Sequence, residues 1–130
     1  MKVFVYRNLR KNLISVRARN GPNAGKVIDW VENAVLYNPI LSVSEASRQR
    51  VIRTKTKNVH AGVIGILKTF ENSSDRIYKK ICTAIYNPYK FNCFVDSITH
   101  KPITQAFDLA IVSINGVELY KDMYNDASSC

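Results

Sequence analysis

The sequence predicts an α+β fold that is mainly antiparallel β, with about seven strands and one short helix near residues 43–52. Three observations support this prediction. Apolar and polar residues alternate through most of the segments that turn residues separate, as in half-buried strands. Asn115-Gly116 stands between two apolar runs, which is a strong hairpin signal. Signals for a helix start occur in one place, after Leu41.

The chain of 130 residues has the length of one domain with its own core. We therefore expect a single domain over residues 1–130. The last residues, 124–130, are polar and small, and we expect them to form a frayed tail.

The first two strands are predicted at residues 2–8 and 13–19, joined as a β-hairpin. The stretch Asn20–Gly25 is dense in Gly, Pro and Asn and predicts a turn. A third strand follows over residues 26–39, bent or broken near Glu32-Asn33, and we expect Asn38-Pro39 to end it.

The helix is predicted from Ser42 and Glu45, which have the spacing of a capping box. The β-branched pair Val51-Ile52 and the following Thr-Lys repeat predict that the helix is short. A long strand is then expected over residues 54–70, polar at first and buried later. Because alternate side chains of a strand share a face, this strand would place Arg53, Lys55 and Lys57 together.

The second half of the chain predicts further strands. Alternation over residues 76–88 is clear, and residues 89–96 form another candidate before a turn at 97–102. The segments 103–114 and 117–124 flank the Asn-Gly hairpin signal.

Positive charge is concentrated at one end of the sequence. Residues 1–60 contain twelve Lys and Arg against three acids, whereas residues 61–130 contain seven against seven, so the first part carries the whole net charge of +9. This asymmetry indicates one basic face and an anionic partner, namely nucleic acid, a nucleotide or an acidic host protein surface. The alternative is a solvated edge strand that Lys and Arg protect against aggregation.

Nine residues are candidates for contacts with the anion. Arginine binds phosphate with two parallel hydrogen bonds, and lysine supplies a mobile point charge. Aromatic residues near these positions in the sequence, Phe4, Tyr6, Trp30 and Tyr37, are candidates for stacking on bases. Charges on the first hairpin, at Arg7, Arg10 and Lys11, would extend the surface if that hairpin lies beside the basic strand. The predicted anion-binding residues are Arg48, Arg50, Arg53, Lys55, Lys57, Asn58, His60, Arg17 and Arg19.

Enzymatic function is poorly supported. The sequence has no Gly-rich phosphate loop, no G-x-S-x-G and no H-E-x-x-H motif, and its carboxylates do not cluster. The three cysteines lack C-x-x-C spacing, so we expect free thiols, no metal site and no cofactor. His60 has two interpretations: a polar group that contacts phosphate, or a structural histidine held by a backbone carbonyl. A metal-free hydrolase built on His60 is the remaining enzymatic alternative.

Two glycines, Gly62 and Gly65, lie in the predicted basic strand. They indicate positions where another backbone or a ligand comes close. No apolar run reaches the roughly 18 residues of a membrane span, and the first residues do not form a signal peptide.

Two segments, "RQRVIRTKTKNVHAGVIG" and "YNPYKFNCFVD", resemble small, mostly uncharacterised proteins of tailed bacteriophages. In those proteins a basic run leads into a "KNVHAGV" strand, and a "YNP" segment ending in "FVD" follows. The resemblance implies an accessory protein that acts in the cytoplasm of an infected bacterium. Such proteins bind host factors or nucleic acid, and some block antiviral defences. The matching positions are Arg50, Arg53, Lys57, Asn58, Val59, His60, Ala61, Gly62, Val63, Gly65, Tyr86, Asn87, Pro88, Lys90, Phe94, Val95 and Asp96.

Together these observations favour a non-enzymatic protein that binds a phosphate-bearing partner through a basic N-terminal face. The main alternative is an inhibitor that binds a host protein. The sequence leaves the oligomeric state and the identity of the partner open.

Overall fold

The computed structural model describes residues 1–56, 58–69, 72 and 76–123. These residues form nine strands and one helix, so the mainly antiparallel fold with a single helix is confirmed and the number of strands is higher than the predicted seven. The elements in chain order are β1 (Lys2–Asn8), β2 (Leu13–Ala18), β3 (Val27–Val31), β4 (Ala34–Val43), α1 (Glu45–Thr54), β5 (Ala61–Leu67), β6 (Tyr78–Ile85), β7 (Val95–Asp96), β8 (Leu109–Ser113) and β9 (Gly116–Asp122).

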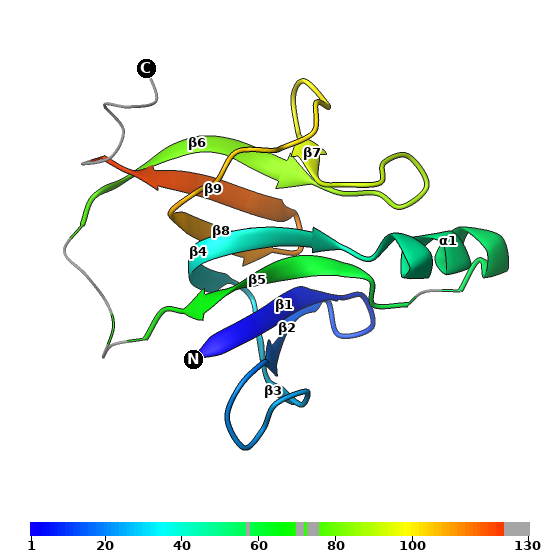
Figure 1. Cartoon of the computed structure of the whole chain (residues 1–130), viewed down its shortest axis with the longest axis horizontal. Coiled ribbons are helices and arrows are strands. Elements are labelled where there is room, and N and C mark those ends of the chain that lie inside the picture. The colour runs from blue at the N-terminus through cyan, green and yellow to red at the C-terminus, as the bar shows by residue number, and fades with distance from the viewer. Residues whose placement is uncertain (57, 70–71, 73–75, 124–130) are drawn as a thin grey trace.

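All nine strands belong to one sheet with the order β3-β2-β1-β5-β4-β8-β9-β6-β7. Every neighbouring pair is antiparallel. Figure 1 shows how strongly the sheet is curled, with α1 projecting beyond the ends of β4 and β5. Strand β4 joins the two halves, because Ala34–Tyr37 pair with β8 on one side while Leu36, Tyr37 and Ile40–Val43 pair with β5 on the other.

The core lies between the two halves of the curled sheet. Side chains from the inner faces of both halves form one buried cluster, as expected when each half has one apolar face. Fully buried members include Val3, Val5, Ile14, Leu36 and Val63 from one half and Ala84, Ala110 and Leu119 from the other.

The prediction of close backbone approach at two glycines is confirmed. A Cβ atom at Gly62 would lie 2.3 Å from the carbonyl oxygen of Val5, and one at Gly65 would lie 3.0 Å from that of Tyr37. Both glycines therefore allow β5 to fit between its two neighbouring strands.

Two hairpins and one loop are confirmed. The β1–β2 connection uses Asn12 at φ 56°, and the β8–β9 connection uses Gly116 at φ 144°. Residues Asn20–Gly25 form the predicted turn before β3.

The helix differs from its prediction at both ends. Its N-cap is Ser44, whose side chain accepts a hydrogen bond from the Ser47 backbone N–H, whereas Ser42 belongs to β4. It continues past Val51-Ile52 because the Val51 side chain is buried at 4% exposure, and this packing outweighs the low helix propensity of β-branched residues. Lys55, in the left-handed conformation at φ 56°, ends the helix and donates its N–H to the Val51 carbonyl.

The prediction of one long, basic strand over residues 54–70 was wrong. Thr54 is the last residue of α1, and strand β5 begins at Ala61, where its pairing with β4 starts; its pairing with β1 starts at Val63. Arg53 and Lys55 therefore do not share a strand face. Lys57 and the predicted frayed tail at 124–130 lie outside the described residues.

Two further predictions needed correction. Asn38-Pro39 does not end a strand: the register of β4 against β5 shifts there, Asn38 adopts φ 51°, and the strand continues to Val43. Such a bulge tolerates a residue without an N–H and a left-handed Asn. The break expected near Glu32-Asn33 is confirmed, because β3 ends at Val31 and β4 begins at Ala34. Only Val95–Asp96 of the predicted strand 89–96 pairs as a strand.

Candidate functional site

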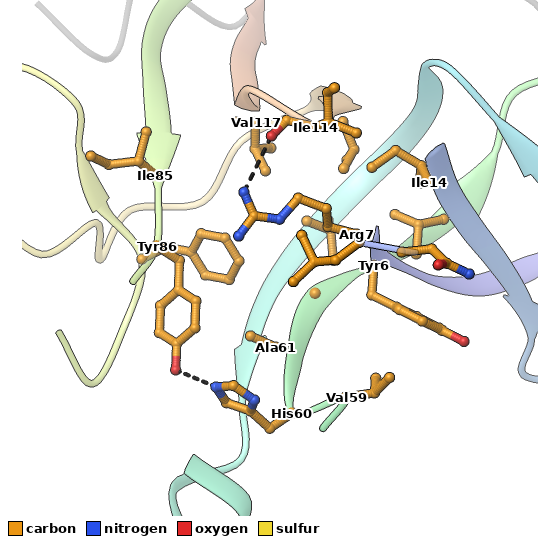
Figure 2. A pocket seen from close by; sticks show the side chains of 18 of the residues that line it. Tyr6, Arg7, Ile14, Val59, His60, Ala61, Ile85, Tyr86, Ile114 and Val117 are labelled. Atoms are coloured by element: carbon orange, nitrogen blue, oxygen red, sulfur yellow. Dashed lines mark hydrogen bonds between the residues drawn. The ribbon is translucent and has the colours of Figure 1, made fainter. Parts of the chain in front are cut away.

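An open groove of about 870 Å³ lies at the end of the sheet beside α1 (Figure 2). Its walls come from the end of β1, the start of β5, the end of β6 with its following loop, and the β8–β9 turn. Its floor is the side of the hydrophobic core, formed by Val5, Ile14, Val63, Ala84, Val112 and Val117.

The charged side chains of this groove are basic. Among the described residues that line it, Arg7 and Arg10 carry charge, and none is an Asp or Glu. Arg7 follows Val3 and Val5 on the inner face of β1, because side chains alternate along a strand. Its guanidinium extends over the groove, and Nη1 donates a 3.4 Å hydrogen bond to the Ile114 carbonyl in the β8–β9 turn (Figure 2).

His60 and Tyr86 form a hydrogen-bonded pair at the opposite wall. The His60 Nε2 and Tyr86 Oη atoms are 2.6 Å apart, and His60 Nδ1 lies 2.9 Å from the Asn58 carbonyl oxygen. Because a carbonyl only accepts, Nδ1 carries the proton in the neutral ring, so Nε2 accepts from the Tyr86 hydroxyl. Burial raises the pKa of Tyr86 to about 12, which keeps this hydroxyl protonated.

Of the nine predicted anion-binding residues, Asn58 and His60 line the groove. The first hairpin does lie beside β5, as the extension of the basic surface required, and it brings Arg7 and Arg10 to the same groove. These four residues, from two segments about fifty positions apart, are the part of the predicted surface that the fold assembles.

The Arg48 side chain is mostly buried and is held by contacts within the protein. Its side chain is 13% exposed. Its Nε donates to the carbonyl oxygens of Pro88 at 3.0 Å and Phe91 at 2.8 Å, and its Nη1 contacts Glu45 at 2.8 Å. Arg48 thereby ties α1 to the loop after β6.

The other basic residues of the helix are exposed. Arg50, Arg53 and Lys55 lie on or at the end of α1, outside the set that lines the groove. Their charged side chains are exposed around α1, and they do not line the groove.

Arg17 and Arg19 do not line the groove. Arg17 lies on the outer face of β2, where its guanidinium carbon is 5.1 Å from the centre of the Tyr6 ring. Arg19 follows the far end of β2, and its backbone N–H donates to the Lys2 carbonyl. Since β2 begins near the groove, Arg19 is about 20 Å away along the strand.

The basic run does not protect a sheet edge. Strand β5, which follows it, lies between β1 and β4 inside the sheet. The interpretation of these residues as an edge-strand device is therefore wrong.

The groove can hold a ligand that is partly apolar and partly anionic. Its floor offers an apolar surface, and Arg7 and Arg10 offer donors for a phosphate or carboxylate. Among the described residues, no three His, Cys, Asp or Glu side chains gather where they could hold a metal ion. Within the same part of the chain, no helix has the length and apolar character needed to cross a membrane.

Tyr86 is the site residue that sequence reasoning did not assign to a role. It lies within the predicted strand over residues 76–88, and nothing in that pattern indicated that it would contact His60, 26 residues away. Arg7 was considered only as an extension of the basic surface, and its alternation with Val3 and Val5 is the signal that places it on the inner face.

Comparison with known proteins gives two matches. A family model described as Mycobacterium phage L5 gene 82 protein matches residues 1–120. The gene 82 protein of Mycobacterium phage L5 is 35% identical over 123 residues, which cover 90% of this chain and 94% of that protein. No solved structure matches the chain. The resemblance to phage proteins seen in the sequence is thus confirmed.

Proposed function

The chain belongs to the family of the Mycobacterium phage L5 gene 82 protein, and we propose that it is a non-enzymatic accessory protein that binds a nucleotide-sized anion in the groove beside α1. Its place of action is the cytoplasm of the infected bacterium. A protein that only binds such a ligand acts by lowering the ligand's free concentration, which is one way to counter a host defence.

The observation that carries this proposal is the charge of the groove. Arg7 and Arg10 face a space whose described lining contains no carboxylate, above a floor of buried aliphatic side chains. An anion is held more strongly beside such a floor than in water, because less solvent screens its attraction to the guanidinium groups.

The dimensions fit a small ligand. A volume of about 870 Å³ lies within the range of roughly 300–1,000 Å³ that small-molecule sites occupy. The base of a nucleotide would lie on the apolar floor, and its phosphate would contact the guanidinium groups.

Binding is better supported than catalysis at His60. Both ring nitrogens are already hydrogen-bonded, one to Asn58 and the other to Tyr86. The ring is therefore held in one orientation, and its polar edge contributes to the wall of the groove. The metal-free hydrolase gains no support from this arrangement.

The test is isothermal titration calorimetry with adenosine monophosphate at low salt. Arg7→Gln removes one guanidinium from the groove, and Arg10→Gln removes the other. Each should weaken binding by about tenfold or more, the effect of losing a hydrogen bond to a charged group. Inorganic phosphate should bind more weakly than the nucleotide, because it cannot use the apolar floor.

The matched control is Arg19→Gln, which changes net charge equally at the far end of β2 and should leave the affinity unchanged. Equal losses of affinity in Arg7→Gln and Arg19→Gln would mean that net charge alone causes the effect, and this result would overturn the groove assignment. The absence of any heat with adenosine monophosphate would overturn nucleotide binding itself.

A second candidate function is inhibition of an acidic host protein. The rim of the groove exposes apolar side chains, with Leu9 at 52%, Val59 at 40% and Tyr89 at 61% exposure. Apolar residues beside charged ones are typical of protein interfaces. Under this alternative, the double change Arg53→Glu and Lys55→Glu should abolish capture of one host protein in nuclease-treated lysate and leave nucleotide binding unchanged.

A further inference from the structure

A second surface lies on the outer face of β1, β2 and β3, on the side of the sheet away from the core, and it meets the groove at Tyr6. Phe4 and Tyr6 alternate with the buried Val3 and Val5 along β1, so their rings face outward. The centres of the two rings are 5.6 Å apart, and their planes differ by 31°.

Trp30 extends this aromatic surface across two strands. Tyr6 on β1 and Trp30 on β3 both pair directly with Ser15 on β2, so the three side chains share one face. Ser15 is 0% exposed although it faces outward, because its neighbours cover it. Trp30 itself is 44% exposed and presents its indole to solvent.

Cations accompany the rings. The Lys11 ammonium lies 4.6 Å from the centre of the Trp30 ring, and the Arg17 guanidinium carbon lies 5.1 Å from that of Tyr6. Arg17 Nη2 also donates to the Tyr6 hydroxyl at 3.3 Å. Contacts of this kind attract a cation to the face of an aromatic ring.

The strands β1 to β5 contain one carboxylate, and a second, Glu32, directly follows β3. The carboxylate within the strands belongs to Asp29, which pairs with Val16 and whose Oδ1 accepts a 2.8 Å hydrogen bond from the Trp30 backbone N–H. The surface therefore combines aromatic rings with the positive charges of Lys11 and Arg17, which lie directly against them.

We propose that this outer face of β1, β2 and β3 binds single-stranded nucleic acid. Unpaired bases stack on the rings of Trp30, Tyr6 and Phe4, as bases do on aromatic sheet surfaces. A base on Trp30 takes the place of the Lys11 ammonium, which then contacts a phosphate. Arg17 stays beside Tyr6 and contacts the next phosphate.

The chemistry of the surface selects this partner. A duplex keeps its bases stacked on one another and offers no free ring to Trp30. An apolar protein surface would bury Lys11 and Arg17 without a counter-charge, which is costly. A single strand supplies both a stacking face and the phosphates that balance the cations. This site shares Tyr6 with the lining of the groove but none of the proposed phosphate-binding residues, so it does not depend on the proposed nucleotide binding.

Trp30 is the only tryptophan of the chain, and its fluorescence reports directly on this surface. Titration with the single-stranded oligonucleotides (dT)10 and (U)10 at low salt should quench it, and the affinity should fall as salt rises. The same sequence in a duplex, and inorganic polyphosphate, should quench far less, because neither offers a free base.

Variants are measured with a fluorescently labelled oligonucleotide by anisotropy. Trp30→Ala should weaken binding by at least about fivefold, the lower range for loss of one base–aromatic stack. Lys11→Gln keeps the indole in place and should weaken binding and its salt dependence. Tyr89→Ala removes an aromatic side chain that is 61% exposed but lies by the groove, and it should leave the affinity unchanged.

Several results would overturn the proposal. These are no quenching at low salt, equal quenching by polyphosphate, or unchanged affinity in a folded Trp30→Ala protein. Failure of this proposal is distinguishable from failure of the proposed nucleotide binding. The Arg7→Gln protein should bind adenosine monophosphate more weakly but should bind (dT)10 with unchanged affinity. If the protein binds adenosine monophosphate but (dT)10 does not quench its fluorescence, the groove assignment stands and the proposal for the outer surface is overturned.

Discussion

The Tyr86 hydroxyl and His60 Nε2 are 2.6 Å apart, and this hydrogen bond connects the two halves of the sheet across the groove. Tyr86 follows β6 and His60 precedes β5, and three other strands separate β5 from β6 in the sheet. The two rings meet edge to face, with centres 5.4 Å apart. The pair therefore fixes the width of the groove at this point.

Tyr86→Phe removes this bond and leaves the ring in place. We expect the free energy of unfolding to fall by about 1–2 kcal/mol, because His60 Nε2 loses its donor. Urea denaturation followed by circular dichroism measures the change. Tyr89→Phe is the control, since the Tyr89 side chain is 61% exposed, and it should have no measurable effect. Equal stability of Tyr86→Phe and the parent protein would show that the bond contributes nothing.

Alkaline pH should act through the same residue. Burial raises the pKa of Tyr86 from 10.0 to about 12, so the folded state favours the protonated phenol. The resulting stabilisation is complete below pH 10, where both states are protonated, and is lost as pH rises to about 12. Urea midpoints measured across this range should fall more steeply in the parent protein than in Tyr86→Phe. Burial also raises the pKa of Tyr120, so a smaller decline should persist in the variant.

Arg48 should be required for stability rather than only for charge. Arg48→Lys keeps the positive charge but cannot reproduce the Nε contact with both Pro88 and Phe91 carbonyls. We expect a loss of about 1.5–3 kcal/mol in the free energy of unfolding. Arg53→Lys, on the exposed last turn of the same helix, should change it by less than about 0.5 kcal/mol. Similar small effects of both substitutions would contradict the structural role of Arg48.

Gly62 should not tolerate a side chain. In Gly62→Ala the new Cβ would meet the Val5 carbonyl oxygen at 2.3 Å and the Phe4 ring at 2.7 Å, so β1 and β5 would have to separate. The expected cost is about 1–3 kcal/mol or more, measured by thermal and urea unfolding. Gly21→Asn is the comparison, because that site is open and Asn adopts its positive φ of 77°. A stable Gly62→Ala protein would mean that the two strands have more room than their pairing indicates.

The elements that the sequence predicted well depend on neighbours along the chain. The β8–β9 hairpin follows from Asn115-Gly116, and β1 and β2 follow from alternation on either side of a short turn. The helix end and the region after it were wrong for a different reason. Val51 belongs to the helix because its side chain is buried against other elements, and propensity alone cannot show this.

The site was only partly predictable for the same reason. Asn58 and His60 could be selected from their place after the basic run, but their partners come from distant segments. Arg7 reaches a carbonyl 107 residues away at Ile114, and Tyr86 reaches His60 through the curl of the whole sheet. Periodicity shows which face of a strand a residue occupies, and it does not show which strand lies opposite.

Strand β4 has a consequence for the way the chain folds. Its first residues, Ala34–Tyr37, pair with β8, and Leu36 and Tyr37 among them also pair with β5. Neither half of the sheet is complete without this strand, so the halves cannot exist as separate folding units. Loss of Trp30 fluorescence, which reports on β3, should coincide with loss of the whole β-sheet signal in a single cooperative transition. Strand β1 pairs with β5 and β4 pairs with β8, and both pairs join segments far apart in the sequence. Refolding should therefore take milliseconds to seconds, as in other sheets formed from non-local strand pairs.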